Sequence, residues 1–266
     1  MYSTVIFSKV GNMKDKENAC VVIPAYNSAK TLKKTISNLD LQFHDNILLV
    51  DDKSTDNTVE IATTLGIKSI SHAINLGYGA NQKTCYSTAL NEGSEIVVML
   101  HPDYQYSPKL VTPMVAIIAS GEYDVVLGSR ILAQSAIKGG MPVYKYIANR
   151  LLTFIENVIV GAKLSEYHTG LRAYSAEALR SVPFNENSND FVFDNQILIQ
   201  LMTAGARIGE ISCPTRYAED SSSINFSRSV KYGFGVLRTA MQFRLNKMGI
   251  RKYDYLKVTP MHRDAN

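Results

Sequence analysis

A group of polar side chains follows an apolar run near the middle of the chain. Val97–Leu100 are all apolar, and His101, Pro102, Asp103 and Gln105 come directly after them. A short apolar run of this kind predicts a buried strand of a parallel sheet. In open α/β sheets, ligands bind beyond the carboxyl ends of the strands. A carboxylate, an amide and an imidazole at such a place can bind a divalent metal ion or a polar ligand.

Other apolar runs end in residues of the same kind. Pro24–Asn27 follow the first run, Asp51 and Asp52 follow the second, and Gly128–Arg130 follow a later one. Mg²⁺ takes one or two carboxylates together with the phosphate oxygens of a substrate. Arg130 can bind a phosphate with two parallel hydrogen bonds. Together these strand ends predict a crevice that binds a nucleotide diphosphate.

The elements that must position these residues alternate between strand and helix. This alternation predicts a doubly wound, mostly parallel sheet. Strands are predicted at 19–23, 47–50, 67–70, 96–100, 125–127, 170–174 and 207–211. Helices are predicted at 28–39, 57–65, 80–91, 107–121, 147–159 and 192–203, and from 225 onward. Pro24 is expected to stop the first strand, Ser28 to cap the first helix, and Asp56 or Asn57 to cap the second.

Composition narrows the class of protein. The 266 residues are 45% hydrophobic and 20% charged, and the net charge of +4 is too small to indicate nucleic-acid binding. The three cysteines lack metal-ligand spacing and are expected to be reduced thiols. The amino terminus lacks the apolar core of a signal peptide, and residues 143–164 are too often interrupted by polar side chains to cross a bilayer. We therefore expect a cytoplasmic protein that can lie peripherally on the cytosolic face of a membrane.

Two common nucleotide-binding motifs are missing from the sequence. No Gly-rich loop ends in Lys-Ser or Lys-Thr, which argues against a P-loop kinase or ATPase. No Gly-x-Gly-x-x-Gly follows the first predicted strand, which argues against a dinucleotide-dependent dehydrogenase.

The ordered set of motifs resembles the family 2 inverting glycosyltransferases, and among them the dolichyl- or polyprenyl-phosphate sugar synthases. The motifs are Val21–Asn27, Val50–Asn57, Asn75–Ala80, His101–Gln105, Gly128–Arg130, Thr169–Tyr174, Glu210–Tyr217 and Ser222–Ile224. The resemblance covers about residues 19–225 and implies a GT-A fold. It also implies a nucleotide-diphosphate sugar as donor and a divalent metal, Mg²⁺ or Mn²⁺, as cofactor.

The resemblance assigns roles to individual residues. Donor binding falls to Pro24, Ala25, Tyr26, Asn27, Asp52, Asn75, Gly79, Asp103 and Arg130, and metal binding to Asp103, Gln105 and His101. Arg150, Arg172 and Arg216 match arginines near the diphosphate or the acceptor phosphate. The chain departs from the pattern at His101, where the family has an Asp, and at Ser28, where a Glu is frequent. The loss of a negative charge at His101 changes the expected metal site.

The acceptor decides which catalytic groups are needed. A lipid phosphate is already anionic, whereas a saccharide or glycolipid hydroxyl needs a general base. The candidate bases are Glu166, His168, Asp190 and Asp194, and they stand beside Asp103 and Arg130 as candidate catalytic residues. A polyprenyl phosphate is the leading acceptor, and a glycan hydroxyl in cell-envelope synthesis is the alternative. A non-catalytic module that binds nucleotide sugars is the third interpretation.

The chain is predicted to divide into a tail at 1–18, a GT-A domain at 19–225 and a basic helical extension at 226–266. Within the domain, 19–130 form the donor half and 131–225 the acceptor half. The apolar stripe of 147–159 is interpreted as core in preference to a membrane surface. Between Asp220 and Asp254 the chain contains no acidic residue, so an anionic membrane is a candidate partner for the last helix. An oligomer is compatible with the sequence.

Overall fold

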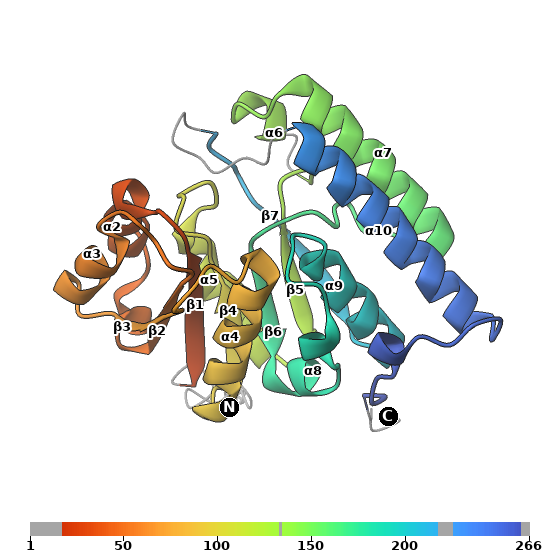
Figure 1. The fold of residues 1–266 in the computed structure, drawn as a ribbon, viewed down its shortest axis with the longest axis horizontal. Helices are drawn as coiled ribbons and strands as arrows, with labels where there is room; N and C mark the ends of the chain where they lie inside the picture. The colour runs from red at the N-terminus through yellow and green to blue at the C-terminus, as the bar shows by residue number, and fades with distance from the viewer. Residues whose placement is uncertain (1–17, 133–134, 218–225, 262–266) are drawn as a thin grey trace, which may run out of the picture.

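A single seven-stranded sheet forms the centre of the protein (Figure 1). The computed structural model describes residues 18–132, 135–217 and 226–261, so the predicted tail up to residue 17 and the motif at 222–224 lie outside it. The strands are β1 (Ala19–Ala25), β2 (Ile47–Asp51), β3 (Lys68–Ser71), β4 (Ile96–Met99), β5 (Val125–Ser129), β6 (Arg172–Ser175) and β7 (Ile208–Ser212). Their order is β3-β2-β1-β4-β6-β5-β7. Only β6 among them runs antiparallel, to both β4 and β5, so the predicted mostly parallel sheet is confirmed.

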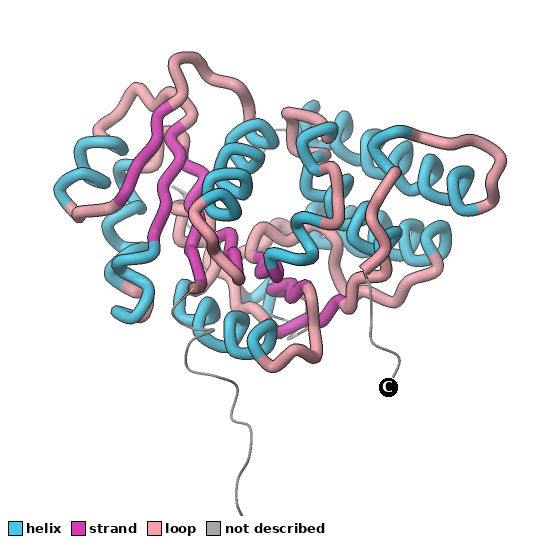
Figure 2. The backbone as a smooth tube through the Cα atoms, turned by 90° about the horizontal axis from the view of Figure 1, so that it is seen from below, coloured by secondary structure: helices cyan, strands magenta, loops and turns pink. Residues whose placement is uncertain are grey.

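Helices cover both faces of the sheet (Figure 2). They are α2 (Ala29–Ser37), α3 (Thr58–Thr64), α4 (Tyr78–Asn91), α5 (Val111–Ala119), α6 (Ser135–Lys138), α7 (Val143–Val160), α8 (Ala176–Arg180), α9 (Phe193–Ala204) and α10 (Phe226–Lys247). Side chains alternate between the faces of a strand. Hence Val21 and Ile23 of β1 pack with α2, α3 and α5, whereas Cys20 and Val22 pack with α4, α8 and α9. Four short 3₁₀ helices complete the fold: η1 (Leu41–Asn46), η2 (Pro108–Leu110), η3 (Phe184–Glu186) and η4 (Asp254–Leu256).

The first strand continues through Pro24, contrary to the prediction. Pro24 pairs in register with Val50, and Ala25 pairs with Asp51. The backbone N and C=O of Pro24 point to the same side of β1 as those of Val22. The carbonyl of Val22 accepts the amide of Leu100, just beyond the end of β4. Pairing with β4 ends at Met99. Because the missing N–H of proline points where no ladder bond is needed, the strand tolerates it.

The start of α2 is capped by Asp56, from the loop between β2 and α3. Ser28 is at the N-cap position, but its hydroxyl donates to the carbonyl of Tyr26. The amide of Ala29 instead donates to Oδ2 of Asp56 at 3.0 Å. Asp56 also accepts the amide of Thr58 at the start of α3. One carboxylate therefore joins the starts of α2 and α3, and its hydrogen bonds hold the pKa of Asp56 below its usual value although burial raises it.

The predicted core stripe on α7 faces outward, so that interpretation was wrong. Ile147, Leu151, Phe154 and Val158 are each more than half exposed. The buried side of α7 is largely polar, and it packs toward the segment that follows the helix. Helical periodicity shows that two faces differ, but it does not show which face turns inward.

The two longest helices, α7 and α10, lie side by side at the outer end of the molecule (Figure 1). Val160 of α7, Ile199 of α9 and Phe243 of α10 form a third, smaller core. Within the described ranges, no helix combines the length and the apolarity that a bilayer crossing requires. The division of the chain into donor half, acceptor half and extension stays a prediction.

Candidate active site

The end of β1 brings an aromatic ring to the sheet edge. Pro24 and Ala25 are buried, whereas the ring of Tyr26 is 53% exposed. Asn27 has φ of 49° and its side-chain oxygen accepts the amide of Thr55 at 2.8 Å. The side chain of Asn27, predicted to bind the donor, therefore joins the β1 and β2 loops. Tyr26 is the residue of this motif whose side chain is available to a ligand.

The two aspartates at the end of β2 have different roles. Asp52 accepts the amides of Leu76 and Gly77, both at 2.9 Å, and a nitrogen of His72 at 2.8 Å. Its carboxylate thus binds the next loop, and its contact with the nucleotide stays a prediction. Asp51 is 2% exposed and uses only Oδ2, which accepts the amide of Ser54. No group in the described part of the chain donates to Oδ1 of Asp51.

The loop before α4 is held by backbone contacts. Asn75 donates to the carbonyl of Asp52 at 3.0 Å, so its amide supports the loop. Gly79 donates its amide to Asn189, and a Cβ at Gly79 would lie 2.4 Å from the carbonyl oxygen of Ser188. The structure thus explains Gly79 by close packing against residues 188–189. Neither residue needs the predicted nucleotide contact to account for its presence.

The imidazole of His101 contacts the ring and the hydroxyl of Tyr78. Its Nε2 lies 3.0 Å from the hydroxyl of Tyr78, and that hydroxyl donates to Oδ2 of Asp194 at 2.7 Å. The rings of His101 and Tyr78 are stacked with centroids 5.6 Å apart. Gly170 packs against the same edge of the imidazole, where a Cβ would lie 2.5 Å from Cδ2. His101 therefore belongs to a row with Tyr78 and Asp194.

Asp103 and Gln105 lie in the turn that follows β4. Oδ1 of Asp103 accepts the amide of Gln105 at 3.0 Å, which shapes the turn, and Gln105 itself is buried. Among the described residues, no three His, Cys, Asp or Glu side chains converge on a metal position. The donor set therefore fits one mode of metal binding, in which one carboxylate acts together with substrate phosphate oxygens.

Arg130 is engaged by a buried carboxylate. Its Nε donates to Oε1 of Glu166 at 2.8 Å, and Nη2 donates to the same oxygen. Nη1 donates to the hydroxyl of Tyr217 at 2.9 Å, and Nη2 also reaches the carbonyl of His168. Burial raises the pKa of Glu166, but the charge and hydrogen bonds of Arg130, with a bond from Asn149, hold it below its usual value. Nε and Nη2 of Arg130 thus both bind Glu166, and binding of a phosphate by Arg130 stays a prediction.

The three other candidate arginines lie in different surroundings. Arg172 is fully buried and donates to the carbonyls of Thr169, Asp194 and Tyr167, and its place near an acceptor phosphate stays a prediction. Arg150 is exposed on α7 and donates to the carbonyl of Ser165. Arg216 is exposed and lies beside the turn that contains Asp103, because its amide donates to the carbonyl of Gln105.

Tyr104 is held between two cations next to Asp103. Nη1 of Arg216 donates to its hydroxyl at 2.9 Å, and Nζ of Lys34 lies 4.3 Å from the ring centroid. Tyr104 has φ of 57°, which is uncommon for a residue with a side chain. Tyr104 and Arg216 line a cavity of about 170 Å³ with Ser107, Leu110 and Pro214. Lys34 and Arg216 are therefore the accessible positive charges beside this turn.

Two of the four candidate bases, His168 and Asp190, lie in surroundings that do not favour removal of a proton from an acceptor. His168 is buried between Glu156 and the hydroxyl of Tyr232, and burial lowers its pKa to about 4. Asp190 forms an exposed ion pair with Lys231 at 3.0 Å. Glu166 is paired with Arg130, and Asp194 accepts from Tyr78 and Gln82. Each candidate base is thus engaged by a neighbouring side chain.

Several partners in these networks were not predicted. Tyr78 lies within the motif Asn75–Ala80, but the resemblance assigned it no function. In the structure it joins His101 to Asp194. Asn149, Thr153 and Glu156 form the inner face of α7. Their spacing of four and three residues places them on one side of a helix, and this spacing was the signal in the sequence.

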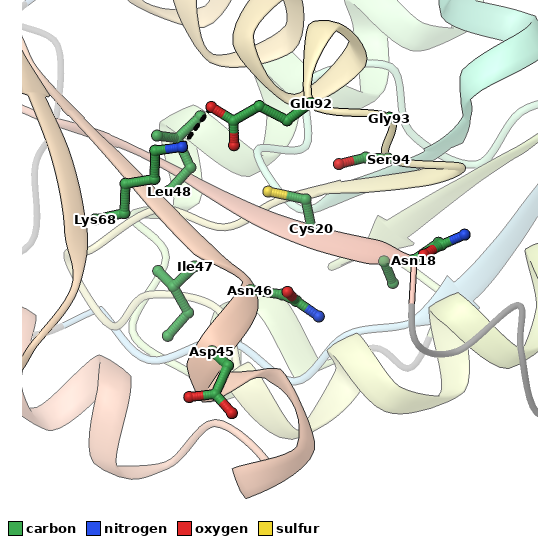
Figure 3. Close-up of a pocket in the computed structure, with 11 residues that line it drawn as sticks. Asn18, Cys20, Asp45, Asn46, Ile47, Leu48, Lys68, Glu92, Gly93 and Ser94 are labelled. Carbon is green, nitrogen blue, oxygen red and sulfur yellow. Dashed lines mark hydrogen bonds and ion pairs between the residues drawn. The ribbon is translucent and has the colours of Figure 1, made fainter.

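A second cavity lies at the opposite, amino-terminal edge of the sheet. It has a volume of about 140 Å³, and Figure 3 shows Lys68 and Glu92 paired across it near Cys20. Burial raises the pKa of the Cys20 thiol to about 11, so it is an unreactive thiol at neutral pH. The conserved geometry of open α/β sheets places ligands at the other edge. We therefore assign the active site to the carboxyl ends of the strands.

The fold is of the GT-A type. Glucosyl-3-phosphoglycerate synthase of Mycobacterium tuberculosis, solved with Mn²⁺, UDP-glucose and phosphoglyceric acid, has the same fold. Its TM-score is 0.64 at 20% identity, over 88% of this chain and 81% of that one. The family model "Glycosyl transferase family 2" matches residues 20–182, more than half of the chain. The protein belongs to the family 2 glycosyltransferases.

Two archaeal relatives are similar over most of their length. An uncharacterized protein of Methanocaldococcus jannaschii is 32% identical over 212 residues, covering 80% of this chain and 87% of the relative. The UDP-N-acetylglucosamine–dolichyl-phosphate N-acetylglucosaminyltransferase of Methanococcus voltae is 29% identical over 245 residues. That match covers 86% of this chain and 96% of the relative.

Proposed function

We propose that this glycosyltransferase moves a sugar from a nucleotide-diphosphate donor to a polyprenyl phosphate at the cytosolic face of a membrane. The observation that carries the proposal is the orientation of α7. Its apolar side is exposed, and its polar side is turned toward the segment after α7 that contains Glu166. A lipid-linked acceptor needs such an apolar surface next to the site. The name of the Methanococcus voltae relative, which includes dolichyl phosphate, supports the same acceptor class.

The donor would bind with its nucleoside at the ends of β1 and β2. Tyr26 offers an exposed aromatic ring, and Asp51 offers a buried carboxylate oxygen. A ring N–H of uracil, guanine or thymine would donate a hydrogen bond to this oxygen. Such a bond is favourable because a buried oxygen without a hydrogen bond costs free energy. The diphosphate would then extend toward the turn that contains Asp103.

Asp103, just beyond the end of β4, would hold a divalent metal together with phosphate oxygens of the donor substrate. When bound, the metal would neutralise charge that develops on the leaving diphosphate. Arg216 and Lys34 would add positive charge beside the same turn. Charges that are fixed in place before the reaction stabilise a transition state strongly. These groups would therefore favour departure of the nucleoside diphosphate.

The acceptor chemistry agrees with the engaged state of the candidate bases. An oxygen of the lipid phosphate would attack the anomeric carbon in line as the bond to the diphosphate breaks, which inverts the configuration. The attacking oxygen is already anionic, so no side chain has to remove a proton. Glu166 and Asp194, which are held by neighbouring side chains, would act as supports in this reaction.

The membrane contact would combine α7 with α10. Phe154 and Val158 on α7 and Phe234 on α10 are among the exposed apolar residues. Lys231, Arg238, Arg244 and Lys247 are exposed on the same helix α10. An anionic bilayer offers both an apolar interior and negative headgroups, and each basic residue near it contributes about 1 kcal/mol. Vesicles that contain anionic lipid are therefore the expected partner of this surface.

The test is a transfer assay with purified protein. Labelled UDP-, GDP- and dTDP-sugars would be offered with polyprenyl phosphate in anionic vesicles, with and without Mg²⁺ or Mn²⁺. We expect label in the lipid fraction with at least one donor, and a loss of about a hundredfold or more in Asp103→Asn. Asp45→Asn, an exposed carboxylate near the other edge of the sheet, is the matched control and should stay active. Absence of a lipid-linked product with every donor would refute the proposal.

A further inference from the structure

The inner face of α7 carries a buried carboxyl group that the proposed reaction does not use. Glu156 is completely buried in the middle of the molecule's outer helix pair. Its Oε1 accepts a hydrogen bond from Nδ2 of Asn195, the residue after Asp194. Its Oε2 lies 3.2 Å from Nε2 of His168. Glu156 therefore connects α7 with the start of α9 and with the loop before β6.

Two buried polar atoms of the described residues face each other here without a hydrogen bond. Among the described residues, nothing donates to Oε2 of Glu156, and Nε2 of His168 is likewise unsatisfied. An isolated buried polar atom costs free energy. One proton between the two atoms satisfies both, carried either by the carboxyl group or by Nε2 of a neutral imidazole. Because Glu156 is completely buried, a proton on the carboxyl group avoids a buried charge. Nδ1 of His168 lies 2.9 Å from the hydroxyl of Tyr232 on α10 and completes the row.

The surroundings favour this neutral arrangement. Burial raises the pKa of Glu156 from 4.5 to about 8, although the hydrogen bond from Asn195 and the charge of Arg172 act in the opposite direction. Burial lowers the pKa of His168 from 6.5 to about 4, against the charge of Glu166. The other titratable groups facing the pair are Tyr167, Tyr232 and Arg130, and the pKa values of both tyrosines are raised by burial. Near neutral pH the contact is thus a hydrogen bond between neutral groups.

The row connects with both networks of the active site. The carbonyl of His168 accepts from Nη2 of Arg130, the arginine that pairs with Glu166. On the other side, Asn195 is adjacent to Asp194, which accepts from Tyr78. Displacement of Glu156 would therefore move groups on both sides of the crevice.

We propose that Glu156 is a positioning residue, which as a neutral carboxylic acid shared with His168 fastens α7 and α10 to the segments that hold Arg130 and Asp194. The activity readout below rests on the proposed function, whereas the stability readout does not. Replacement by glutamine preserves the arrangement, because its amide donates to His168 and its oxygen accepts from Asn195. Replacement by alanine removes both bonds.

The first experiment measures urea unfolding of the wild type and Glu156→Gln between pH 6.5 and 8. The folded carboxyl keeps a proton that the unfolded chain releases, so its stabilising effect is present below pH 4.5 and is lost as the pH rises toward 8. The lowered pKa of His168 makes stability change with pH in the opposite direction, but only below about pH 6.5. Between pH 6.5 and 8, we expect the equilibrium constant for unfolding of the wild type to rise by up to about tenfold per pH unit relative to that of Glu156→Gln. Equal pH slopes would overturn the proposal.

The second experiment measures kcat and KM for sugar transfer. Glu156→Gln should retain its kcat near pH 7, whereas Glu156→Ala should lose about tenfold or more with little change in donor KM, because misplaced groups slow the reaction. Thr153→Val, a buried change on the same face, should keep the pH slope of the wild type. A glutamine variant as impaired as the alanine variant would contradict the proposal. If the wild type itself transfers no sugar, the proposed function fails, but the pH slope still decides the role of Glu156.

Discussion

The two sides of the crevice use their polar side chains in different ways. On the nucleotide side, Asp52 and Asn27 bind backbone amides of neighbouring loops. On the side of α7, Arg130, Glu166 and His168 bind each other inside the fold. The first side is built from short contacts at strand ends, and it leaves Tyr26 open to a ligand. The comparison teaches that a charged residue within a family motif can have a structural task, and that its partners show which task it has.

The largest expected effect comes from the buried side. Glu166→Ala leaves the Arg130 guanidinium buried without its carboxylate, so we expect a loss of about 3–5 kcal/mol in the free energy of unfolding. Urea denaturation followed by circular dichroism measures it. Asp190→Ala breaks an ion pair with Lys231 that is largely exposed, and it should cost at most about 1 kcal/mol. Similar losses in both variants would remove the distinction between the two kinds of pair.

The adjacent aspartates of β2 provide the next test. Asp52→Asn should destabilise the protein by about 1–3 kcal/mol, because one of the amides of Leu76 and Gly77 loses its acceptor. Asp51→Asn should leave stability nearly unchanged and weaken nucleotide-sugar binding by about tenfold or more, the value of a hydrogen bond to a charged group. Thermal unfolding and calorimetry separate the two effects. The reverse result, with Asp52 needed for the donor and Asp51 for stability, would restore the assignment made from the sequence.

The smallest effect concerns the outer face of α7. Phe154→Ser should weaken binding to anionic vesicles by about tenfold, because burying a Phe side chain contributes about 1.5–3 kcal/mol. Flotation with lipid vesicles measures the bound fraction. Leu41→Ser changes an apolar residue on η1 that is even more exposed than Phe154 and remote from α7, and it should bind as the wild type does. Binding should also fall as salt rises, because α10 contributes charge. Unchanged binding of Phe154→Ser would exclude this face as the contact.

The sequence was sufficient for the fold and for the edge of the sheet at which the polar strand ends meet. Apolar runs ending in Asn27, Asp52 and Gln105 predicted strands whose carboxyl ends meet at one edge, and the sheet confirms them. Side-chain partners were harder to predict, because Arg130, Glu156 and Tyr232 meet through tertiary contacts between distant segments. The outward apolar face of α7 could not be deduced from periodicity alone, since the inward choice depends on hydrogen bonds of Asn149 and Glu156.

Transfer to two matched lipids tests the proposed acceptor most directly. Polyprenyl phosphate and the corresponding polyprenol differ only in that one presents an anionic phosphate and the other a hydroxyl that needs a base. Each would be offered in the same anionic vesicles with the active sugar nucleotide, and the labelled lipid product would be counted. We predict rapid transfer to the phosphate and none to the alcohol, because Glu166, His168, Asp190 and Asp194 are all engaged. Comparable transfer to the alcohol would contradict this account.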